Sequence, residues 1–315
     1  MKVLVTGAFG NLGQLVVEQL LADGHQLRCC DLDAPQQRQL AKPYQARCEI
    51  LLGDITDSAQ HAALVDDMDA IVHLASILPP LTERAPAVAH RVNVDASCSL
   101  IDQAQAQSRA PLFIFPSSVT VFGHSQRQAP LRHCADPVIA TDQYTEHKLA
   151  VEQYLQQSAI PWVIMRVGVS VDARTTRTER EVLRQLLEIH PDTPLEYIHP
   201  RDVALAISRA LSCPAAQAKT LLLGGGERCQ INQRQFINTA FQALGLPLPE
   251  GIHGQANFYT HWMDTRESQA LLNYQRHSFE DYQQEMHTLF ANVRRLLWPL
   301  RPILRPLLPT VLKQL

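Results

Sequence analysis

The residues most suited to acid/base chemistry lie in YTEHK (144–148), where a phenol precedes an ammonium by four positions. On a helix, positions i and i+4 share one face, so Lys148 would favour the phenolate form of Tyr144. A free phenol has a pKa of about 10 and a free ammonium about 10.4, so neither exchanges protons well near neutral pH without help. The pair therefore indicates a general acid/base, although a solvated helix face has the same spacing.

A glycine-rich segment, GAFGNLG (7–13), follows a short apolar run and precedes a helical pattern. Gly7 permits a tight turn, Gly10 allows close backbone approach to a pyrophosphate, and Gly13 allows close packing of helix and sheet. A phosphate would there meet free N–H groups at the positive end of the helix. The segment predicts a dinucleotide-binding loop, whereas a plain turn is the alternative.

Asp31 ends the second apolar run, eighteen residues after Gly13. A carboxylate at this position accepts both ribose hydroxyls of an adenosine and repels a 2'-phosphate. No arginine follows, since the next residues are Leu32 and Asp33. The sequence therefore predicts NAD rather than NADP, unless Asp31 is only a capping or surface residue.

Positioning these residues requires strands and helices in alternation. Runs that are apolar on both faces, such as KVLVT and AIVHLA, are typical of a parallel sheet covered by helices on each side. The pattern predicts a doubly wound α/β sheet with ligands beyond the carboxyl ends of its strands. The expected strands are Lys2–Thr6, Gln26–Asp31, Glu49–Gly53, Ala70–Ala75, Leu112–Ser117 and Trp162–Val167, and the expected helices are Asn11–Ala22, Ser58–Leu64, Pro86–Gln107 and Thr141–Ser158.

After Val167 the alternation loosens, and the chain divides into three regions. Residues 1–167, with about 201–224, form the expected Rossmann domain, and residues 168–200 and 225–292 form a smaller, mostly helical substrate lobe. Residues 293–315 form a basic arm rich in proline and leucine. The later elements expected are helices Arg177–Glu188 and Arg201–Leu211 and strands Leu195–His199 and Thr220–Leu223.

The composition excludes several classes of protein. The chain has 315 residues, 46% hydrophobic and 19% charged, with a formal net charge of −3, so no basic field indicates nucleic acid. Seven cysteines include no CxxC and thirteen histidines no HExxH, so we expect reduced thiols and no metal. The N-terminus does not resemble a signal peptide, and no run of eighteen uncharged apolar residues occurs, so we expect a cytoplasmic protein.

Seven motifs in order resemble the extended short-chain dehydrogenase/reductase family, also called the NAD-dependent epimerase/dehydratase family. The resemblance covers about residues 1–230 and implies a Rossmann fold, bound NAD and a homodimer built from the two long helices. The motifs are GAFGNLG (7–13), GDITD (53–57), HLAS (73–76), NVDAS (93–97), FPSSVTVFG (115–123), YTEHK (144–148) and YIHPRDVALAISRAL (197–211).

The resemblance assigns roles to individual residues. Tyr144 would be the general acid/base, Lys148 would lower its pKa and hold the nicotinamide ribose, and Ser118 would hydrogen-bond the reacting oxygen, with Ser117 as the second choice. The implied cofactor-binding residues are Gly7, Phe9, Gly10, Asn11, Leu12, Gly13, Asp31, Asp54, Ile55, Leu74, Ala75, Ser76, Asn93, Tyr144 and Lys148. Substrate contacts are expected in Ile77–Leu81, Val119–Phe122 and Ser170–Arg180, foremost Ile77, Val119, Thr120 and Arg177.

Departures from the family pattern narrow the reaction. His147 stands where the family usually has Ser or Thr, and we expect it to be exposed, with a proton relay as the weaker alternative. Ser118-Val119-Thr120 lacks the two acids of the family's dehydratases, so we do not expect elimination of water. The segment Arg166–Val169 lacks the Asn that helps sugar-nucleotide enzymes hold a pyrophosphate.

Three functions follow, in order of expectation. The first is reversible hydride transfer at a secondary alcohol or ketone carbon of a sugar-like or nucleotide-sugar substrate, as in an epimerase. The second is a simple alcohol dehydrogenase or ketone reductase acting on a sterol-like or aldonate-like substrate. The third is a non-catalytic NAD-binding protein of assembly or sensing, against which Ser118, Tyr144 and Lys148 all argue.

The last 23 residues, VRRLLWPLRPILRPLLPTVLKQL, carry five basic side chains and no acid. Four prolines, at 299, 302, 306 and 309, argue against one regular helix. One interpretation is a peripheral membrane-surface anchor, and the charges argue against a spanning segment. The interpretation favoured from sequence is an arm packed on its own domain or on a partner subunit.

Overall fold

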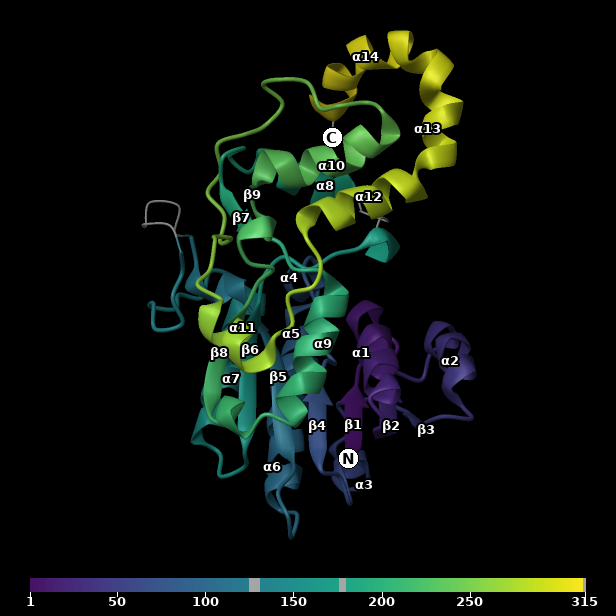
Figure 1. Ribbon diagram of the computed structural model, residues 1–315. Helices are drawn as coiled ribbons and strands as arrows, with labels where there is room; N and C mark the ends of the chain where they lie inside the picture. The colour runs from purple at the N-terminus through teal and green to yellow at the C-terminus, as the bar shows by residue number, and fades with distance from the viewer. Residues whose placement is uncertain (125–130, 176–179, 314–315) are drawn as a thin grey trace.

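The computed structural model describes residues 1–124, 131–175 and 180–313, and its centre is a seven-stranded parallel sheet (Figure 1). The predicted doubly wound sheet is confirmed, because the order places β1 between β2 and β4, and the chain winds outward from β1 in both directions. In spatial order the strands are β3 (Glu49–Leu52), β2 (Gln26–Asp31), β1 (Lys2–Thr6), β4 (Ala70–His73), β5 (Leu112–Ser118), β6 (Trp162–Val167) and β8 (Lys219–Leu223).

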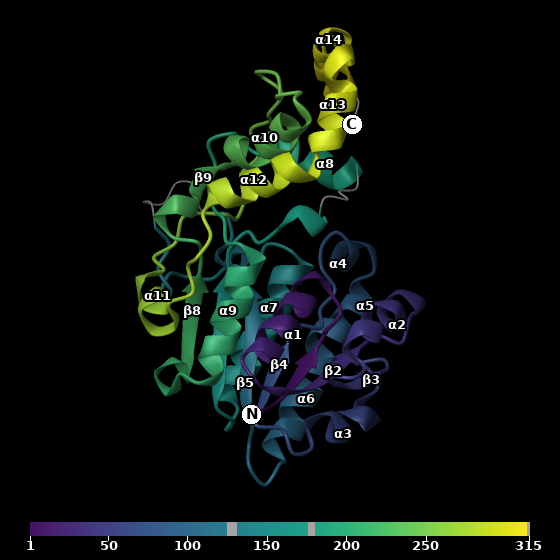
Figure 2. The ribbon, with the colours of Figure 1, turned by 45° about the vertical axis from the view of Figure 1, so that its right-hand side comes forward.

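Successive residues of the strands enter two different hydrophobic cores. In β1, Val3 and Val5 pack with helices α1 (Asn11–Ala22) and α9 (Pro200–Leu211), which lie in front of the sheet in Figure 2. Leu4 packs on the opposite face, under the helices α3 (His61–Val65), α6 (Ala96–Gln105) and α7 (Gln143–Gln157). Both faces of the central strands are therefore buried, as the apolar runs predicted.

The helix predicted over 86–107 has an interruption that the sequence pattern did not indicate. It consists of α5 (Pro86–His90), a π-helical turn (Arg91–Asp95) and α6. Two further helices, α2 (Pro35–Ala41) and α4 (Leu81–Arg84), lie in segments for which the sequence predicted no helix or strand, and each begins after a residue without a side-chain cap. The predicted homodimer, built from the helices 86–107 and 141–158, stays a prediction.

The C-terminal lobe lies above the carboxyl ends of the strands (Figures 1 and 2). Its core forms where Tyr197, Ile231 and Tyr282 pack together, and a second cluster joins Leu187 to Ile237. The lobe contains α8 (Arg180–Glu188), β7 (Pro194–Glu196), β9 (Gln230–Asn232), α10 (Gln233–Leu244) and α12 (Phe279–Leu289), whereas α11 (Arg266–Leu272) packs beside β8 at the sheet edge.

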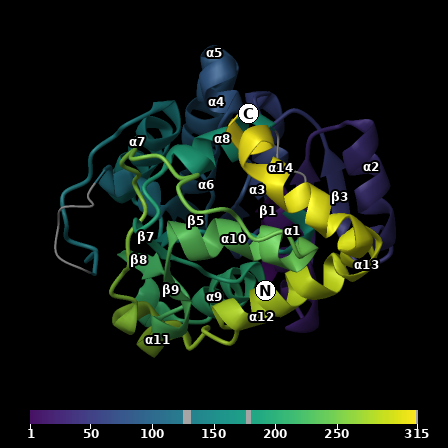
Figure 3. The same cartoon turned by 90° about the horizontal axis from the view of Figure 1, so that it is seen from above.

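The C-terminal arm consists of α13 (Ala291–Leu297), a 3₁₀ turn (Trp298–Leu300) and α14 (Arg301–Lys313), which together curve around one end of α10 (Figure 3). The arm is not one regular helix, as the prolines predicted, although Pro306 and Pro309 lie inside α14. Each removes one backbone hydrogen bond. Packing of Leu308 and Leu312 against the lobe offsets part of that loss.

Candidate active site

The carboxyl ends of β1 and β4 open a groove at the point where the strand order reverses, which is where open α/β sheets bind ligands. Two cavities occupy it. The Asp31 cavity, of about 410 Å³, and the Tyr144 cavity, of about 450 Å³, are named here after one lining residue each. The two cavities are adjacent, because both are lined by Gly7, Gly10, Leu74 and Ser76.

The glycine loop has the backbone geometry that a phosphate cradle requires. Gly7 has φ +65°, and a Cβ on it would lie 2.8 Å from the backbone nitrogen of Ala75. A Cβ on Gly13 would lie 2.1 Å from the carbonyl oxygen of Gly7, so no larger residue fits. Gly10 precedes α1 and offers no side-chain cap to its first N–H groups. Asn11, Leu12 and Gly13 at the start of α1 line the Tyr144 cavity, so the free N–H groups of this helix end fit an anionic diphosphate.

Asp31 is fixed by the loop that it faces. Its Oδ2 accepts a hydrogen bond from the backbone N–H of Phe9 at 2.7 Å, and its Oδ1 accepts one from Leu32 at 2.8 Å. Burial raises the pKa of Asp31, and the two backbone hydrogen bonds oppose that shift. The carboxylate lines the Asp31 cavity with lone pairs left for ribose hydroxyls. Phe9 itself is buried and acts through its N–H.

Most of the other residues expected to bind the cofactor line one of the two cavities. Asp54, Ile55, Leu74, Ala75 and Ser76 line the Asp31 cavity, and Asn11 and Leu12 line the Tyr144 cavity.

Asn93 lines neither cavity. It lies in the π-helical turn, where its Oδ1 accepts from the N–H of Ile77 at 2.7 Å and its Nδ2 donates to the Ile77 carbonyl at 2.9 Å. The π-helical turn thus places the Asn93 side chain against the backbone of Ile77. Turns of this kind are frequent at functional sites.

Tyr144 and Lys148 reach the Tyr144 cavity from the first two turns of α7. Asp142 caps this helix: its side chain accepts from the Thr145 N–H at 2.8 Å, while the Thr145 hydroxyl oxygen accepts from the Asp142 N–H at 3.1 Å. This capping box fixes where the helix begins, so it also fixes the face on which the phenol and the ammonium lie.

The electrostatics of this pair differ in one respect from the sequence-based expectation. Burial raises the pKa of Tyr144 to about 12, and the hydrogen bond with Ser118 lowers it only in part. Burial also lowers the pKa of Lys148 to about 8. The ammonium lies 5.6 Å from the centre of the Tyr144 ring and donates to the carbonyl of Pro116 at 2.9 Å. Desolvation therefore outweighs the attraction of the cation in the protein alone.

Ser118 is both a cap and a partner of the phenol. Its Oγ accepts from the N–H and the hydroxyl of Thr120, at 3.3 and 3.0 Å, and it lies near enough to the phenol to lower the pKa of Tyr144. Ser117 also lines the Tyr144 cavity, yet its buried Oγ has no partner among the described residues. The geometry favours Ser118 for contact with a reacting oxygen.

Of the four foremost substrate candidates, the three that the structure describes are not brought to the phenol. Ile77 lines the Asp31 cavity, Val119 is 3% exposed within a hydrophobic cluster, and Thr120 turns its hydroxyl to Ser118. Arg177 lies outside the described residues.

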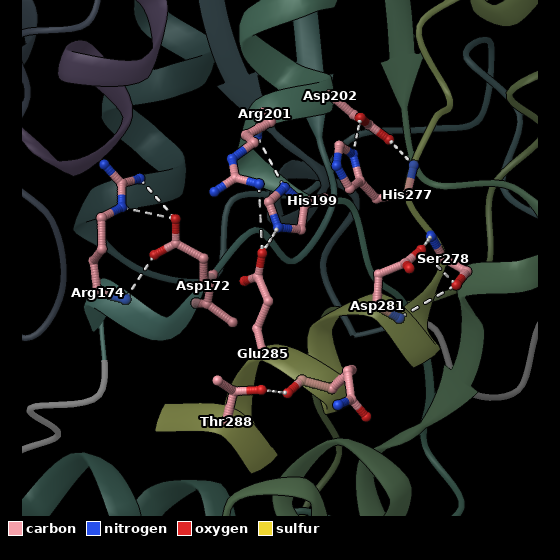
Figure 4. Close-up of polar contacts among 12 residues, drawn as sticks. Asp172, Arg174, His199, Arg201, Asp202, His277, Ser278, Asp281, Glu285 and Thr288 are labelled. Atoms are coloured by element: carbon pink, nitrogen blue, oxygen red, sulfur yellow. Dashed lines mark hydrogen bonds and ion pairs between the residues drawn. The ribbon is translucent and has the colours of Figure 1, made fainter. Parts of the chain in front are cut away.

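Other residues of the expected substrate segments do face the Tyr144 cavity, namely Leu78, Ser170, Val171, Asp172 and Arg174. Arg174 is paired with Asp172 at 2.7 Å, as Figure 4 shows, so its charge is already compensated. Sequence reasoning missed Gln37, Val88, Arg91, Val92 and Pro200, which also line the groove. The first four belong to α2, α5 and the π-helical turn, whose geometry has no sequence signal.

His147 is buried, contrary to the expectation of an exposed side chain. Its Nδ1 lies 3.3 Å from the Asn93 Nδ2, its ring meets that of His90 edge-on at 5.3 Å, and its Nε2 has no partner among the described residues. Burial lowers the pKa of His147, so the ring is neutral near pH 7. His147 therefore packs against Asn93, the residue that holds the backbone of Ile77, and we assign it a structural role.

The His-x-x-Asp segment joins α9 to the start of α12 (Figure 4). Asp202 accepts from the backbone N–H groups of Arg276 and His277, each at 2.9 Å, and its Oδ1 lies 2.6 Å from the His277 Nδ1. His199 stacks on His277 at 4.3 Å and lies 3.3 Å from Glu285. This motif is structural: it holds the lobe on the sheet beside the Tyr144 cavity. Within the described residues, no group of three or more potential ligands is placed to hold a metal ion.

Comparison with known proteins gives one family and a consistent fold. The model of the NAD dependent epimerase/dehydratase family matches residues 3–224. A photosystem II assembly factor Ycf39 from Trieres chinensis is 27% identical over 227 residues, which are 71% of this chain and 64% of that protein. A D-erythronate dehydrogenase from Cupriavidus necator is 26% identical over 243 residues, 66% of this chain and 71% of that protein.

Among solved structures, a UDP-glucose-4-epimerase from Stenotrophomonas maltophila with bound NAD and formylated UDP-arabinopyranose superposes with a TM-score of 0.75. It is 23% identical, and the alignment covers 95% of this chain and 99% of that one. At this identity the likeness concerns the fold alone. The alignment with Ycf39 leaves about a third of that relative's length unmatched.

Proposed function

Because the chain belongs to the NAD dependent epimerase/dehydratase family, we propose that it catalyses reversible hydride transfer at a secondary alcohol or ketone carbon, with Tyr144 as the general acid/base. The observation that carries the proposal is the meeting of Ser118, Tyr144 and Lys148 with the glycine loop in one cavity. The family is NAD dependent, so NAD is the cofactor. When bound, NAD accepts or supplies the hydride.

The residues of the groove fit this cofactor at both ends. The uncapped N–H groups at the start of α1 and the missing side chains of Gly7, Gly10 and Gly13 leave room and donors for the diphosphate. Asp31 would hold the adenosine ribose, and Lys148, with one hydrogen bond made to Pro116, has further donors for the second ribose.

In the proposed oxidation, the phenolate oxygen of Tyr144 takes the proton from a substrate hydroxyl held beside Ser118. In the reverse direction, the phenol returns that proton to the forming alkoxide. The Ser118 hydroxyl steadies the charge that develops on the same oxygen. Because burial raises the pKa of Tyr144 to about 12, the phenolate needs the neighbouring cation of Lys148 and a positively charged cofactor ring to form near neutral pH.

The substrate class follows from what surrounds the phenol. Most of the surface of the Tyr144 cavity is apolar, with contributions from Leu78, Val171 and Pro200, and the one arginine among its described lining residues is compensated by Asp172. At the end of β6, Arg166 is buried in an ion pair with Glu152 at 2.7 Å and lines neither cavity. These features favour a small or partly apolar alcohol that leaves as a ketone, the dehydrogenase alternative, over a nucleotide-sugar.

Epimerisation through a transient ketone remains the second candidate, because it uses the same acid/base residue. Cofactor stoichiometry separates the two reactions. We would incubate the protein with NAD and a panel of aldonates, sterols and UDP-sugars, follow NADH at 340 nm, and analyse the products by NMR. Net NADH formation supports the dehydrogenase, whereas an inverted stereocentre without net NADH supports the epimerase.

Tyr144→Phe tests the mechanism on whichever substrate the panel identifies. Loss of the proton-transfer group is expected to lower kcat roughly 10²- to 10⁴-fold while the Kd for NAD changes little. Tyr154→Phe is the matched control, because Tyr154 lies on the same helix and its hydroxyl donates a hydrogen bond to Asp102 at the protein surface. Retention of kcat in Tyr144→Phe would overturn the proposed role.

An NAD-binding assembly protein is a rival, since one relative is described as an assembly factor. In a deletion strain, the rival predicts that Tyr144→Phe restores the phenotype fully and that Gly13→Val, which blocks the glycine loop, does not. The enzymatic proposal predicts that both variants fail.

A further inference from the structure

The arm carries a row of apolar side chains that face outward. Seven of the sixteen exposed large hydrophobic residues of the described chain lie between 293 and 311, and Leu296, Trp298 and Ile303 are 79%, 68% and 62% exposed. Six of the seven repeat at intervals of three or four residues, so they follow one helical face where the backbone is helical. This outer row consists of Val293, Leu296, Leu300, Ile303, Leu307 and Val311.

The orientation of the outer row is fixed by packing on the other side of the arm. Leu308 and Leu312 enter a cluster with Leu183 and Ile237 of α8 and α10. Arg294 donates to the carbonyl of Ala243 at 3.2 Å, which fastens α13 to the same lobe. The arm is therefore docked on its own lobe, as the sequence favoured, but only by its inner side. The outer row is left without a cover among the described residues.

A basic groove of about 420 Å³ lies along the arm, lined by Arg294, Arg295, Trp298 and Arg301. The Nε of Arg301 is buried and has no hydrogen-bond partner among the described residues. Guanidinium groups bind phosphate through paired N–H donors, and an exposed indole is typical of the boundary between water and lipid. The groove has the chemistry of a site for phosphodiester headgroups.

The charge of the arm is opposite to that of the rest of the chain. The net charge is −3 for all 315 residues and +5 for residues 293–315, which leaves −8 for residues 1–292. An anionic surface would attract the arm and repel the remainder. It would therefore hold the molecule in one orientation, with the outer row toward the surface.

Helix length and proline content place the arm on a bilayer rather than across it. None of the helices in the described ranges is both long enough and apolar enough to span a membrane. The 13 residues of α14 extend about 20 Å, against about 30 Å of hydrocarbon. Pro306 and Pro309 leave carbonyl groups without intrahelical partners, which water and headgroups satisfy at the interface but hydrocarbon does not.

We propose that residues 291–313 dock the chain on an anionic phospholipid bilayer. The outer row lies at the boundary of headgroups and acyl chains, and the exposed side chains of Arg295 and Arg305 extend to the lipid phosphates. This property is independent of the reaction in the Tyr144 cavity.

The test is co-sedimentation of the full-length protein with vesicles of phosphatidylcholine alone and of phosphatidylcholine mixed with phosphatidylserine. We expect binding to the mixed vesicles at least tenfold tighter than to the neutral ones, and weaker binding as salt is added. Ile303→Ser/Leu307→Ser removes two members of the outer row, and Arg295→Glu/Arg305→Glu reverses two charges. Each double variant should bind the mixed vesicles roughly tenfold more weakly or worse. Point variants are preferable to cutting the chain at 292, because the cut would also uncover Leu183 and Ile237.

Val138→Ser/Ile139→Ser is the matched control, because these two residues are also exposed and apolar but lie far along the chain from the arm. Circular dichroism and light scattering of every variant establish its fold and its oligomeric state. Equal binding of the arm variants and the control variant would overturn the proposal, as would failure of the wild type to bind the mixed vesicles. A dimer that dissociates in Ile303→Ser/Leu307→Ser, without any vesicle binding by the wild type, would also overturn it and assign the outer row to a second copy of the chain.

Discussion

At the Asp31 end of the groove, the carboxylate is held by two backbone N–H groups, whereas the Tyr144 end holds a half-buried phenol near Ser118 and a buried ammonium that donates to Pro116. The first end is made of groups that the protein itself satisfies. The second contains groups whose pKa values are displaced by burial, to about 12 for Tyr144 and about 8 for Lys148. The comparison shows that the fold positions a ligand at the Asp31 end. At the Tyr144 end it withholds water from polar groups, so that a bound ligand supplies their missing hydrogen bonds and charges.

Gly13→Val tests the first end most severely. A side chain would meet the Gly7 carbonyl oxygen at a Cβ distance of 2.1 Å, so the loop and α1 must separate. We expect the Kd for NAD to rise more than 100-fold and the free energy of unfolding to fall by about 3 kcal/mol, as for overpacking. Calorimetric titration and urea denaturation measure the two quantities.

Gly10→Ala is the companion variant, because its Cβ would contact only the Gly7 oxygen, at 3.4 Å. The fold should tolerate it, while the new methyl narrows the approach of the diphosphate and weakens NAD binding. If Gly13→Val bound NAD as tightly as the wild type, the groove would not hold the diphosphate at this loop.

Ser118→Ala tests the second end. It removes the hydroxyl that lowers the pKa of Tyr144 and the proposed donor for the reacting oxygen, so kcat should fall about 100-fold with little change in the Kd for NAD. Steady-state kinetics on the identified substrate measure both. Ser117→Ala is the control: its Oγ has no partner in the described part of the chain, so the variant should keep its kcat. The reverse ranking would transfer the role to Ser117.

Asp31→Asn probes the charge at the first end without changing its shape. The amide still reaches a ribose hydroxyl, but the repulsion of a 2'-phosphate is lost. The ratio of Kd values for NADP and NAD should therefore fall roughly tenfold, measured by fluorescence titration of both cofactors. A ratio equal to that of the wild type would mean that Asp31 is only a loop anchor for Phe9.

Lys148→Met should stabilise the protein at neutral pH, although it removes a residue proposed for catalysis. The folded-state pKa of about 8 lies below the ordinary value of 10.5, so burial of the ammonium costs stability below pH 8, and that cost declines as the pH rises toward 10.5. After the loss of the hydrogen bond to Pro116, we expect a gain of about 1–2 kcal/mol at pH 7. The gain should shrink or reverse by pH 10.

Urea denaturation at pH 7 and pH 10 measures this dependence, with the surface variant Lys42→Met as the control that should show neither effect. A loss of stability in Lys148→Met at pH 7 would contradict the claim that burial of the Lys148 ammonium at the Tyr144 end of the groove costs stability.

The sheet and the glycine loop were predictable from sequence because they depend on local signals. Strands such as Lys2–Thr6 are apolar on both faces, and Gly7, Gly10 and Gly13 have spacing that only a few backbone conformations explain. Asp31 follows from its position at the end of such a strand. Each of these inferences needs only residues that are neighbours in sequence.

The residues that the sequence did not reveal depend on contacts between distant segments. Gln37 and Arg91 line the groove only because α2 and the π-helical turn fold against it, and that turn also carries Asn93, which bonds the backbone of Ile77. The exposure of His147 was also predicted wrongly, since its burial depends on packing against His90 and Asn93. The burial of Tyr144 likewise reverses the direction of its expected pKa shift.

The capping box at the start of α7 connects the position of Tyr144 to that of the preceding segment, residues 131–141. The Thr145 hydroxyl accepts from the N–H of Thr141 at 2.9 Å, and Ile139 is paired with the backbone of Val121 at 2.8 Å. A change of sequence in 131–141 would therefore tilt the phenol relative to Ser118 without touching either residue. Closely related enzymes with the same reacting groups would differ in turnover through this connecting segment, which makes it the first place to look when activity varies among natural variants.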